Sequence, residues 1–195
     1  MRTVFRPAAT AALLAALLAG CTTGSYRLDA TVQSYSSVAS LPAPPTYRLE
    51  RLPSQANAPE QSRLEALADP ALFRAGLRRD DAAPHYAVQV ASRTQRAINT
   101  TALGGGWGWP FWGGPPIPTA ANTSYQREVD VVVRELPGNR VVFESKAASD
   151  TFYLNSDEVL AAMFDAALAG FPQGTQGPRH VVVQVQRLAQ APAAR

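Results

Sequence analysis

The sequence predicts an α+β fold: a two-layer sandwich in which a mainly antiparallel sheet carries two helices on one face. Several segments alternate apolar and polar residues, which is typical of strands with one buried face. Two other segments repeat apolar residues at helical spacing. The turn sequence Pro137-Gly138-Asn139 lies between two alternating segments and predicts a hairpin. The expected order is β-β-α-β, a loop, and then β-β-α-β.

Two strands are expected before the first helix. Residues 26–36 alternate, and Leu28, Ala30 and Val32 share one side of that strand. A stiff proline-rich connection then leads to residues 46–52, which alternate again.

The first helix is expected to begin near Asn57, which lies three residues before Glu60 in a helix-start pattern with Pro59 in the first turn. Pro70 lies inside the segment, so the helix either kinks there or restarts with Asp69 as its cap. The apolar stripe of this helix consists of Leu64, Leu67, Ala71 and Ala75.

Three central strands are expected, at residues 85–91 with a continuation toward residue 98, at residues 125–136 and at residues 140–147. Their apolar side chains share one face and predict the centre of the core: Tyr86, Val88, Val90, Tyr125, Val129, Val131 and Val133. Polar side chains of these strands and of the last strand predict that the opposite face of the sheet is solvent-exposed: Gln89, Glu128, Asp130, Arg134, Glu144, Lys146, Gln184 and Gln186.

The second helix is expected to have Ser156 as its cap and to end at Gly170 and Pro172. A last strand is expected over residues 179–187. The helix carries an apolar stripe that indicates core packing rather than a cofactor pocket, formed by Leu160, Met163, Phe164, Ala167, Leu168 and Phe171.

The start of the chain predicts a lipoprotein signal peptide over residues 1–20. Arg2 and Arg6 precede an uncharged Ala/Leu run that is too short to cross a bilayer, and Cys21 is the only cysteine of the chain. The sequence Leu-Ala-Gly-Cys resembles the bacterial lipoprotein box, in which the cysteine is acylated, so we expect membrane attachment through Cys21. The alternative is an ordinary small-residue cleavage site that happens to precede a cysteine.

These signals divide the chain into parts. A lipidated tether is expected over residues 21–25, a single periplasmic domain over residues 26–188 and a flexible tail over residues 189–195. Inside the domain, residues 102–122 form a loop rich in glycine and tryptophan. Six glycines lie within the eleven residues 104–114, which disfavours a helix or strand there.

The aromatic loop is the candidate contact site. Its large apolar side chains, Trp107, Trp109, Phe111 and Trp112, are costly to leave in water, and tryptophan is common at protein interfaces and at membrane surfaces. The alternatives are contact with an envelope protein or glycan, contact with the bilayer, and a flexible insertion that has no specific partner.

The charge, the histidines and the absence of catalytic motifs argue against several functions. Without residues 1–20 the chain has 16 basic and 15 acidic residues, a net charge of +1 with no basic stripe, so nucleic-acid binding is not expected. His85 and His180 each open a strand and could meet if those strands were neighbours. A metal site would need further ligands, and no HxxH or HxH spacing is present, so neither a metal nor a cofactor is expected. There is no nucleophile-elbow motif, and we expect no enzyme activity.

Two groups of charged residues have structural and functional interpretations. The acidic pairs Asp80-Asp81 and Asp157-Glu158 lie at a helix end and a helix start, which favours a structural role over catalysis. The second group consists of Arg93, Arg96 and Arg127. These arginines could bind lipid headgroups or an anionic glycan, but the favoured interpretation is that they are solvated residues near strand ends without a ligand.

Taken in order, the lipobox, TYRLERLPSQANAPEQSRLE, LRRDDAAPHYAVQV, the Gly/Trp-rich insert, YQREVDVVVRELPGNRVVFESKA and AAMFDAALAGFP resemble the domain of unknown function 4136 family of bacterial lipoproteins. The resemblance covers about residues 26–187. It implies a triacylated (palmitate-bearing) Cys21 and, because Thr22 rather than aspartate follows it, an outer-membrane anchor facing the periplasm. The family has no established reaction, so the resemblance assigns no catalytic residue.

Three functions follow as hypotheses. The favoured one is a non-enzymatic, lipid-anchored envelope module that docks a partner through the sheet edge or the aromatic loop. The second is a small-ligand or lipid-binding protein with the aromatic loop as a lid over an apolar groove, or an auxiliary lipoprotein of an envelope transport system, the latter by analogy of fold alone. The third, a hydrolase of an envelope polymer, is disfavoured by the inventory above.

Overall fold

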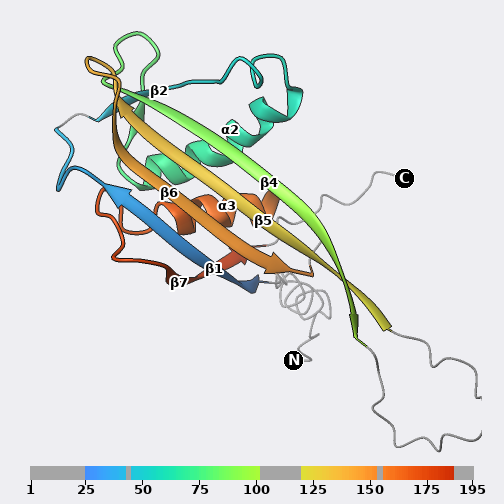
Figure 1. Ribbon diagram of the computed structural model, residues 1–195. Coiled ribbons are helices and arrows are strands. Elements are labelled where there is room, and N and C mark those ends of the chain that lie inside the picture. Colours follow the sequence, from blue (N-terminus) through green and yellow to red (C-terminus); the bar gives the residue numbers. More distant parts are fainter. Residues whose placement is uncertain (1–24, 43–44, 102–119, 153–155, 187–195) are drawn as a thin grey trace, which may run out of the picture.

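The computed structural model describes residues 25–42, 45–101, 120–152 and 156–186 of the chain. These residues form one mixed seven-stranded sheet and two helices, which confirms the α+β class (Figure 1). The strand order is β3-β2-β4-β5-β6-β1-β7. Neighbouring strands are antiparallel except that β2 runs parallel to both β3 and β4.

The predicted order of elements is confirmed, with one short strand added. The strands are β1 (Ser25–Ser36), β2 (Thr46–Leu49), β3 (Arg78–Arg79), β4 (Tyr86–Thr101), β5 (Ala120–Glu135), β6 (Arg140–Thr151) and β7 (Arg179–Gln186). The helices are α2 (Pro59–Arg74) and α3 (Ser156–Ala167).

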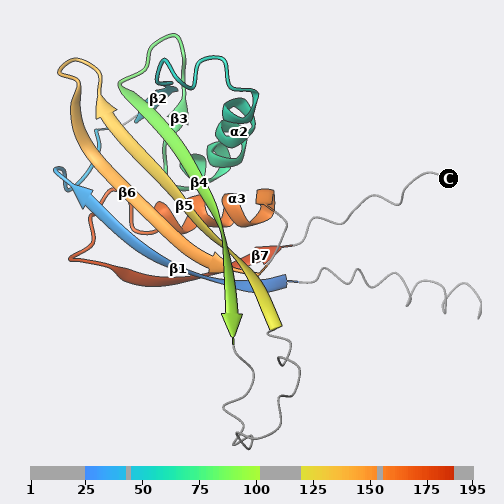
Figure 2. The ribbon, with the colours of Figure 1, turned by 45° about the vertical axis from the view of Figure 1, so that its right-hand side comes forward.

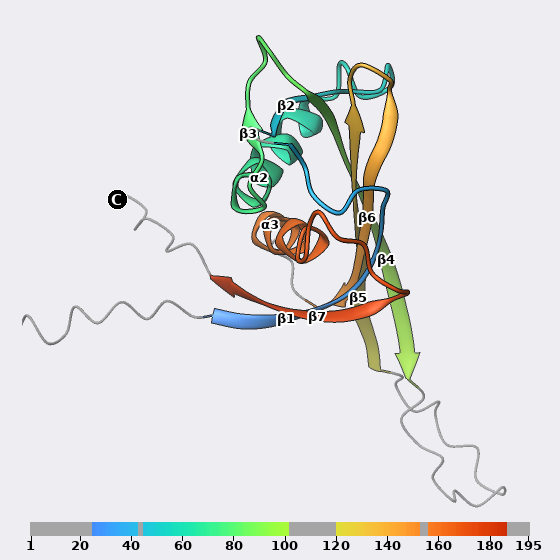
Figure 3. The ribbon, with the colours of Figure 1, turned by 90° about the vertical axis from the view of Figure 1, so that its left-hand side faces the viewer.

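Both helices lie on the same side of the sheet, and the sheet curls so that β1 and β7 pass beneath α3 (Figure 3). Side chains alternate between the two faces of a strand, as the sequence pattern of β5 predicts. Val129, Val131 and Val133 therefore face the helices, and all three are fully buried. From α3, Met163 and Phe164 fill the same core. The core therefore lies between the helices and one face of the sheet.

The start of α2 differs from the prediction. The N-cap is Ala58 rather than Asn57, and no side chain caps the helix; Pro59 does lie in the first turn. Pro59 restricts the residue before it to an extended backbone, which explains why Ala58 holds the N-cap position.

Pro70 neither restarts the helix nor divides it, because α2 runs continuously through this residue. The carbonyl that loses its partner belongs to Ala66, whose exposed position lets water replace the missing hydrogen bond. Asp69 is not a cap: it accepts a hydrogen bond from the Tyr47 hydroxyl at 2.8 Å and one from Arg79 at 3.0 Å.

Several strand bounds also differ from the expected ones. β2 ends at Leu49 rather than at residue 52, because Arg51 turns to α2 and pairs with Glu65 at 2.6 Å. β3 was not predicted; it has only two residues and pairs with Thr46 and Tyr47 of β2. The central strands β4, β5 and β6 are all longer than expected.

Strands β4 and β5 form a hairpin that projects beyond the rest of the sheet (Figure 2). Their ladder runs from the pair Tyr86–Glu135 to the pair Thr101–Ala120, whereas β6 follows β5 only as far as Tyr125. The contact-loop residues Trp107, Trp109, Phe111 and Trp112 lie outside the described residues, and so does Cys21. Among the described helices, none is long and apolar enough to span a membrane.

Candidate functional site

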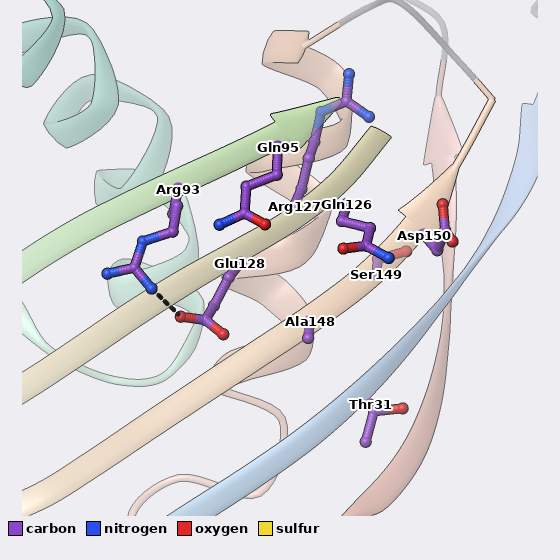
Figure 4. Close-up of a pocket in the computed structure, with 9 residues that line it drawn as sticks. All are labelled: Thr31, Arg93, Gln95, Gln126, Arg127, Glu128, Ala148, Ser149 and Asp150. Carbon is purple, nitrogen blue, oxygen red and sulfur yellow. Dashed lines mark ion pairs between the residues drawn. The ribbon is translucent and has the colours of Figure 1, made fainter. Parts of the chain in front are cut away.

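A polar pocket of about 370 Å³ lies on the face of the sheet opposite the helices (Figure 4). It crosses four neighbouring strands, β4, β5, β6 and β1. Its lining residues are Thr31, Arg93, Gln95, Gln126, Arg127, Glu128, Ala148, Ser149 and Asp150. This pocket is the candidate functional site of the described residues.

Strand register brings the polar side chains of the pocket together. Gln95 of β4 is paired directly with Gln126 of β5, and two residues along the same strands Arg93 is paired with Glu128. Directly opposed residues of an antiparallel pair project from the same face at short separation. The two amides therefore form one polar pair and the two charged groups form another.

Small residues make the hollow beside these pairs. Ala148 of β6 is paired with Thr31 of β1 on one side and with Glu128 of β5 on the other. A methyl and a short hydroxyl side chain fill less space than the amide and charged side chains on β4 and β5, which leaves the pocket open above them.

The Glu128 carboxylate is shared between two cations. Its Oε1 accepts a hydrogen bond from Lys146 Nζ at 3.0 Å and lies 3.6 Å from Arg93 Nη1. Lys146 also lies 3.6 Å from Asp130, and the hydrogen bond with Glu128 raises the pKa of this lysine. Burial raises the pKa of Asp130, against the attraction of Lys146. The polar face is therefore a connected network of ion pairs.

Arg127 belongs to the other face of β5. It is 2% exposed, its Nη1 donates to Thr151 Oγ1 at 2.7 Å, and its guanidinium lies 5.1 Å from the centre of the Tyr125 ring. Burial lowers the pKa of this guanidinium. In Figure 4 its side chain extends away from Arg93 and Glu128.

The three arginines that the sequence grouped as one cationic cluster are therefore separated. Arg93 is paired with Glu128, Arg127 is buried, and Arg96 is exposed on β4. The period of the strand could have revealed this, because Arg127 is two residues from Val129 and so shares its inward face. The amide pair at Gln95 and Gln126 was missed because neither glutamine forms part of a known motif.

The two histidines do not meet. Strands β5, β6 and β1 lie between β4, which follows His85, and β7, which contains His180. The His85 ring is hydrogen-bonded to the hydroxyl of Thr46, with 2.7 Å between Nδ1 and Oγ1. Within the described ranges no three metal-ligating side chains come together.

The acidic pairs have structural partners, as their positions indicate. The Asp157 carboxylate of α3 accepts hydrogen bonds from Arg63 of α2 and links the two helices. Asp80 accepts hydrogen bonds from the backbone of Ala82 and Ala83 at 3.0 Å each, and Asp81 pairs with Arg79.

A second pocket, of about 400 Å³, lies where α2, the start of α3 and β4 meet. Leu64, Leu67 and Leu160 give it an apolar wall, and the Arg63–Asp157 ion pair lies at the same pocket. It is a groove between helices and sheet of the kind that could accept an apolar group.

Comparison with solved structures gives matches of low sequence identity. A PDZ domain protein from Parabacteroides distasonis ATCC 8503 has 13% identity and a TM-score of 0.47; the match covers 90% of this chain but only 42% of that protein. The PelC dodecamer from Paraburkholderia phytofirmans has 12% identity, a TM-score of 0.46 and coverages of 72% and 95%. A minor lipoprotein from Acinetobacter baumannii has 13% identity, a TM-score of 0.36 and coverages of 65% and 87%.

No curated protein matches the chain. A family model, by contrast, matches residues 31–173, which include the two helices, every strand from β2 to β6 and half of β1. The chain belongs to the family described as Domain of unknown function (DUF4136).

Proposed function

We propose that the protein is a non-enzymatic, lipid-anchored module of the bacterial envelope that binds an envelope glycan in the polar pocket of its sheet. The observation that carries this proposal is the directly opposed amide pair, Gln95 and Gln126, beside an arginine whose charge Glu128 already balances. The anchor at Cys21 and the periplasmic face of the outer membrane are parts of the same proposal.

The chemistry of the pocket suits a neutral ligand that carries many hydroxyl groups. An amide side chain both donates and accepts hydrogen bonds, as a sugar hydroxyl does. Two carboxylates, Glu128 and Asp150, and one exposed guanidinium, Arg93, belong to the pocket lining. Lys146 beside the pocket also pairs with Glu128, so the basic and acidic groups balance and leave no net positive charge to attract an anion. A neutral glycan therefore fits better than an anionic one.

A binding role also fits the partners of the charged groups. General acid–base catalysis needs a side chain that is positioned to exchange a proton with a substrate. Glu128, the carboxylate at the centre of the pocket, is instead engaged by both Arg93 and Lys146. The charged residues of the pocket support a shaped polar surface rather than a reaction.

The anchor is supported by the sequence and by the place of the domain in the chain. The Leu-Ala-Gly-Cys sequence ends at Cys21, and β1 begins four residues later at Ser25. A single acyl chain holds a protein at a membrane only marginally, whereas several chains hold it stably. A triacylated Cys21 would thus keep the domain close to the membrane surface, within reach of periplasmic glycans.

The glycan proposal is tested by removing the amides. The double variant Gln95→Ala/Gln126→Ala should bind soluble, uncharged glycan fragments (oligomers of N-acetylglucosamine) about 30-fold more weakly than wild type, because two hydrogen bonds at about 1 kcal/mol each are lost. Isothermal titration calorimetry measures the affinity.

The matched control is Gln184→Ala, which changes an exposed glutamine of β7 outside the pocket and should leave the affinity unchanged. Wild-type protein that binds no fragment, or a double variant that binds as tightly as wild type, would contradict the proposal.

The apolar pocket favours a second candidate function, the binding of a small apolar ligand or lipid. Leu64, Leu67 and Leu160 would contact the ligand, and the aromatic loop would be its lid. Native mass spectrometry of protein extracted from membranes should then detect a retained ligand that is lost in Leu67→Arg. A mass that equals that of the chain with its anchor alone would count against this function.

A further inference from the structure

The two edge strands of the sheet differ in how well they are protected against pairing with a further strand. The β3 edge has two residues, Arg78 and Arg79, and both are exposed; shortness and charge are the usual devices that keep sheet edges from pairing. The β7 edge has eight residues, and Arg179 at its first position is the only arginine, lysine or carboxylate among them. Within the described part of the chain, β7 pairs with β1 alone.

The core is also incompletely covered beside β7. Leu28 and Ala30 of β1 are buried, whereas their partners on β7, Val183 and Val181, are only partly buried. On the opposite face of β7, Val182 is 55% exposed. A further strand beside β7 would therefore pair with backbone groups that face no strand of the described residues, and it would cover apolar surface on both faces.

The strand required at this edge has the pattern of β7 itself. It needs apolar residues at alternate positions toward the helices, and β7 supplies Val181, Val183 and Val185. Two copies of β7 related by a twofold axis would be antiparallel, with the valines of both on the helix side. With the axis at Val182, each Arg179 would face Val185 of the other copy, so no like charges would be opposed.

We infer that β7 is a dimerisation edge, and that a second copy of this chain pairs its own β7 there to form a continuous sheet. The helices of both copies would then cover the same face of this sheet. The inference goes beyond the proposed glycan site and does not depend on it, because the pocket and the β7 edge share no residue.

The test measures the mass of the full chain, extracted in detergent, by light scattering coupled to size-exclusion chromatography. Wild type should be a dimer, and Val182→Lys should be a monomer because it places a charge at the centre of the paired edge. Leu52→Lys is the matched control: it makes the same kind of change at a 47%-exposed residue outside the strands, and it should remain a dimer.

A second measurement locates the contact. Val182→Cys should give a dimer with a short bis-maleimide crosslinker, whereas wild type and Leu52→Cys should not, and this pair of controls accounts for any reaction of Cys21. Circular dichroism should show that every variant is folded.

Three results would overturn the inference. The first is a wild-type monomer at every concentration tested. The second is a dimer that Val182→Lys leaves intact. The third is a wild-type monomer that dimerises only after residues 188–195 are deleted, which would mean that the chain's own tail occupies the edge. Loss of glycan binding in the pocket variants would affect none of these results.

Discussion

At the scale of single residues, the ion pair between Arg51 and Glu65 connects the segment after β2 to α2. Glu65 is buried, and its two carboxylate oxygens accept hydrogen bonds of 2.6 Å each from Arg51 Nε and Nη2, while Gln61 donates at 3.3 Å. Burial alone raises the pKa of Glu65, but these hydrogen bonds outweigh burial, and the net pKa is lowered.

A lowered pKa in the folded state makes a carboxylate stabilising above the pKa of the unfolded chain. That stability is lost as the pH falls from the ordinary value of 4.5 through the folded pKa of Glu65. Glu65→Gln should therefore reduce stability at neutral pH and lessen the loss of stability on acidification. Urea denaturation at several pH values between about 3 and about 7 measures both effects.

Asp130 provides a comparison of opposite sign, because burial raises its pKa. Its protonation favours the folded state, so Asp130→Asn should not lessen acid denaturation as Glu65→Gln does. If wild type and Glu65→Gln lose stability with the same slope below pH 4.5, the role given to the Arg51–Glu65 pair is wrong.

The sequence predicts well which single residues are buried where the alternation of apolar and polar residues along a strand determines it. Leu28, Ala30 and Val32 are buried as the alternation indicates. It predicts them poorly where a charged residue interrupts the period, since Arg127 lies on the inward face between Tyr125 and Val129 and is buried there. Only the structure supplies the contacts with Thr151 and Tyr125 that accompany this burial.

At the scale of elements, two adjacent residues of α2 separate core packing from surface contact. Leu72 is fully buried, whereas Phe73 is 60% exposed and lies under the Arg78 guanidinium at 3.9 Å. Leu72→Ala should lower the free energy of unfolding by about 2–5 kcal/mol, because it leaves a cavity between helix and sheet. Urea denaturation followed by circular dichroism measures the change.

Phe73→Ala is the matched control and should cost less than about 1 kcal/mol, since it removes an exposed ring and one cation–π contact. Equal losses for the two variants, or a larger loss for Phe73→Ala, would show that α2 does not pack as described.

The two helices and the long strands could be predicted because each contains its own periodic signal. The short elements could not. Strand β3 exists because Arg78 donates its backbone N–H to Pro45, a residue far away in the chain, and no local pattern indicates that bond. The early end of β2 has the same kind of cause, because Arg51 is drawn to Glu65 of α2.

At the scale of the whole molecule, the candidate site depends on which strands are neighbours. The sequence predicts the order of elements along the chain, but not that β1 lies between β6 and β7. That placement brings Thr31 beside Ala148 and opens the polar pocket, and it also keeps His85 far from His180. Long-range pairing, which has no signal within a single segment, is therefore the part of the site that only the structure provides.

The central claim, that this domain is tethered to a membrane by an acylated cysteine, is tested most directly by the intact mass of protein extracted from membranes. We expect a chain that begins at Cys21 and carries the added mass of its acyl groups, and we expect Cys21→Ala to lose both the added mass and the membrane association. A wild-type chain in the membrane fraction that carries no acyl mass would contradict the claim.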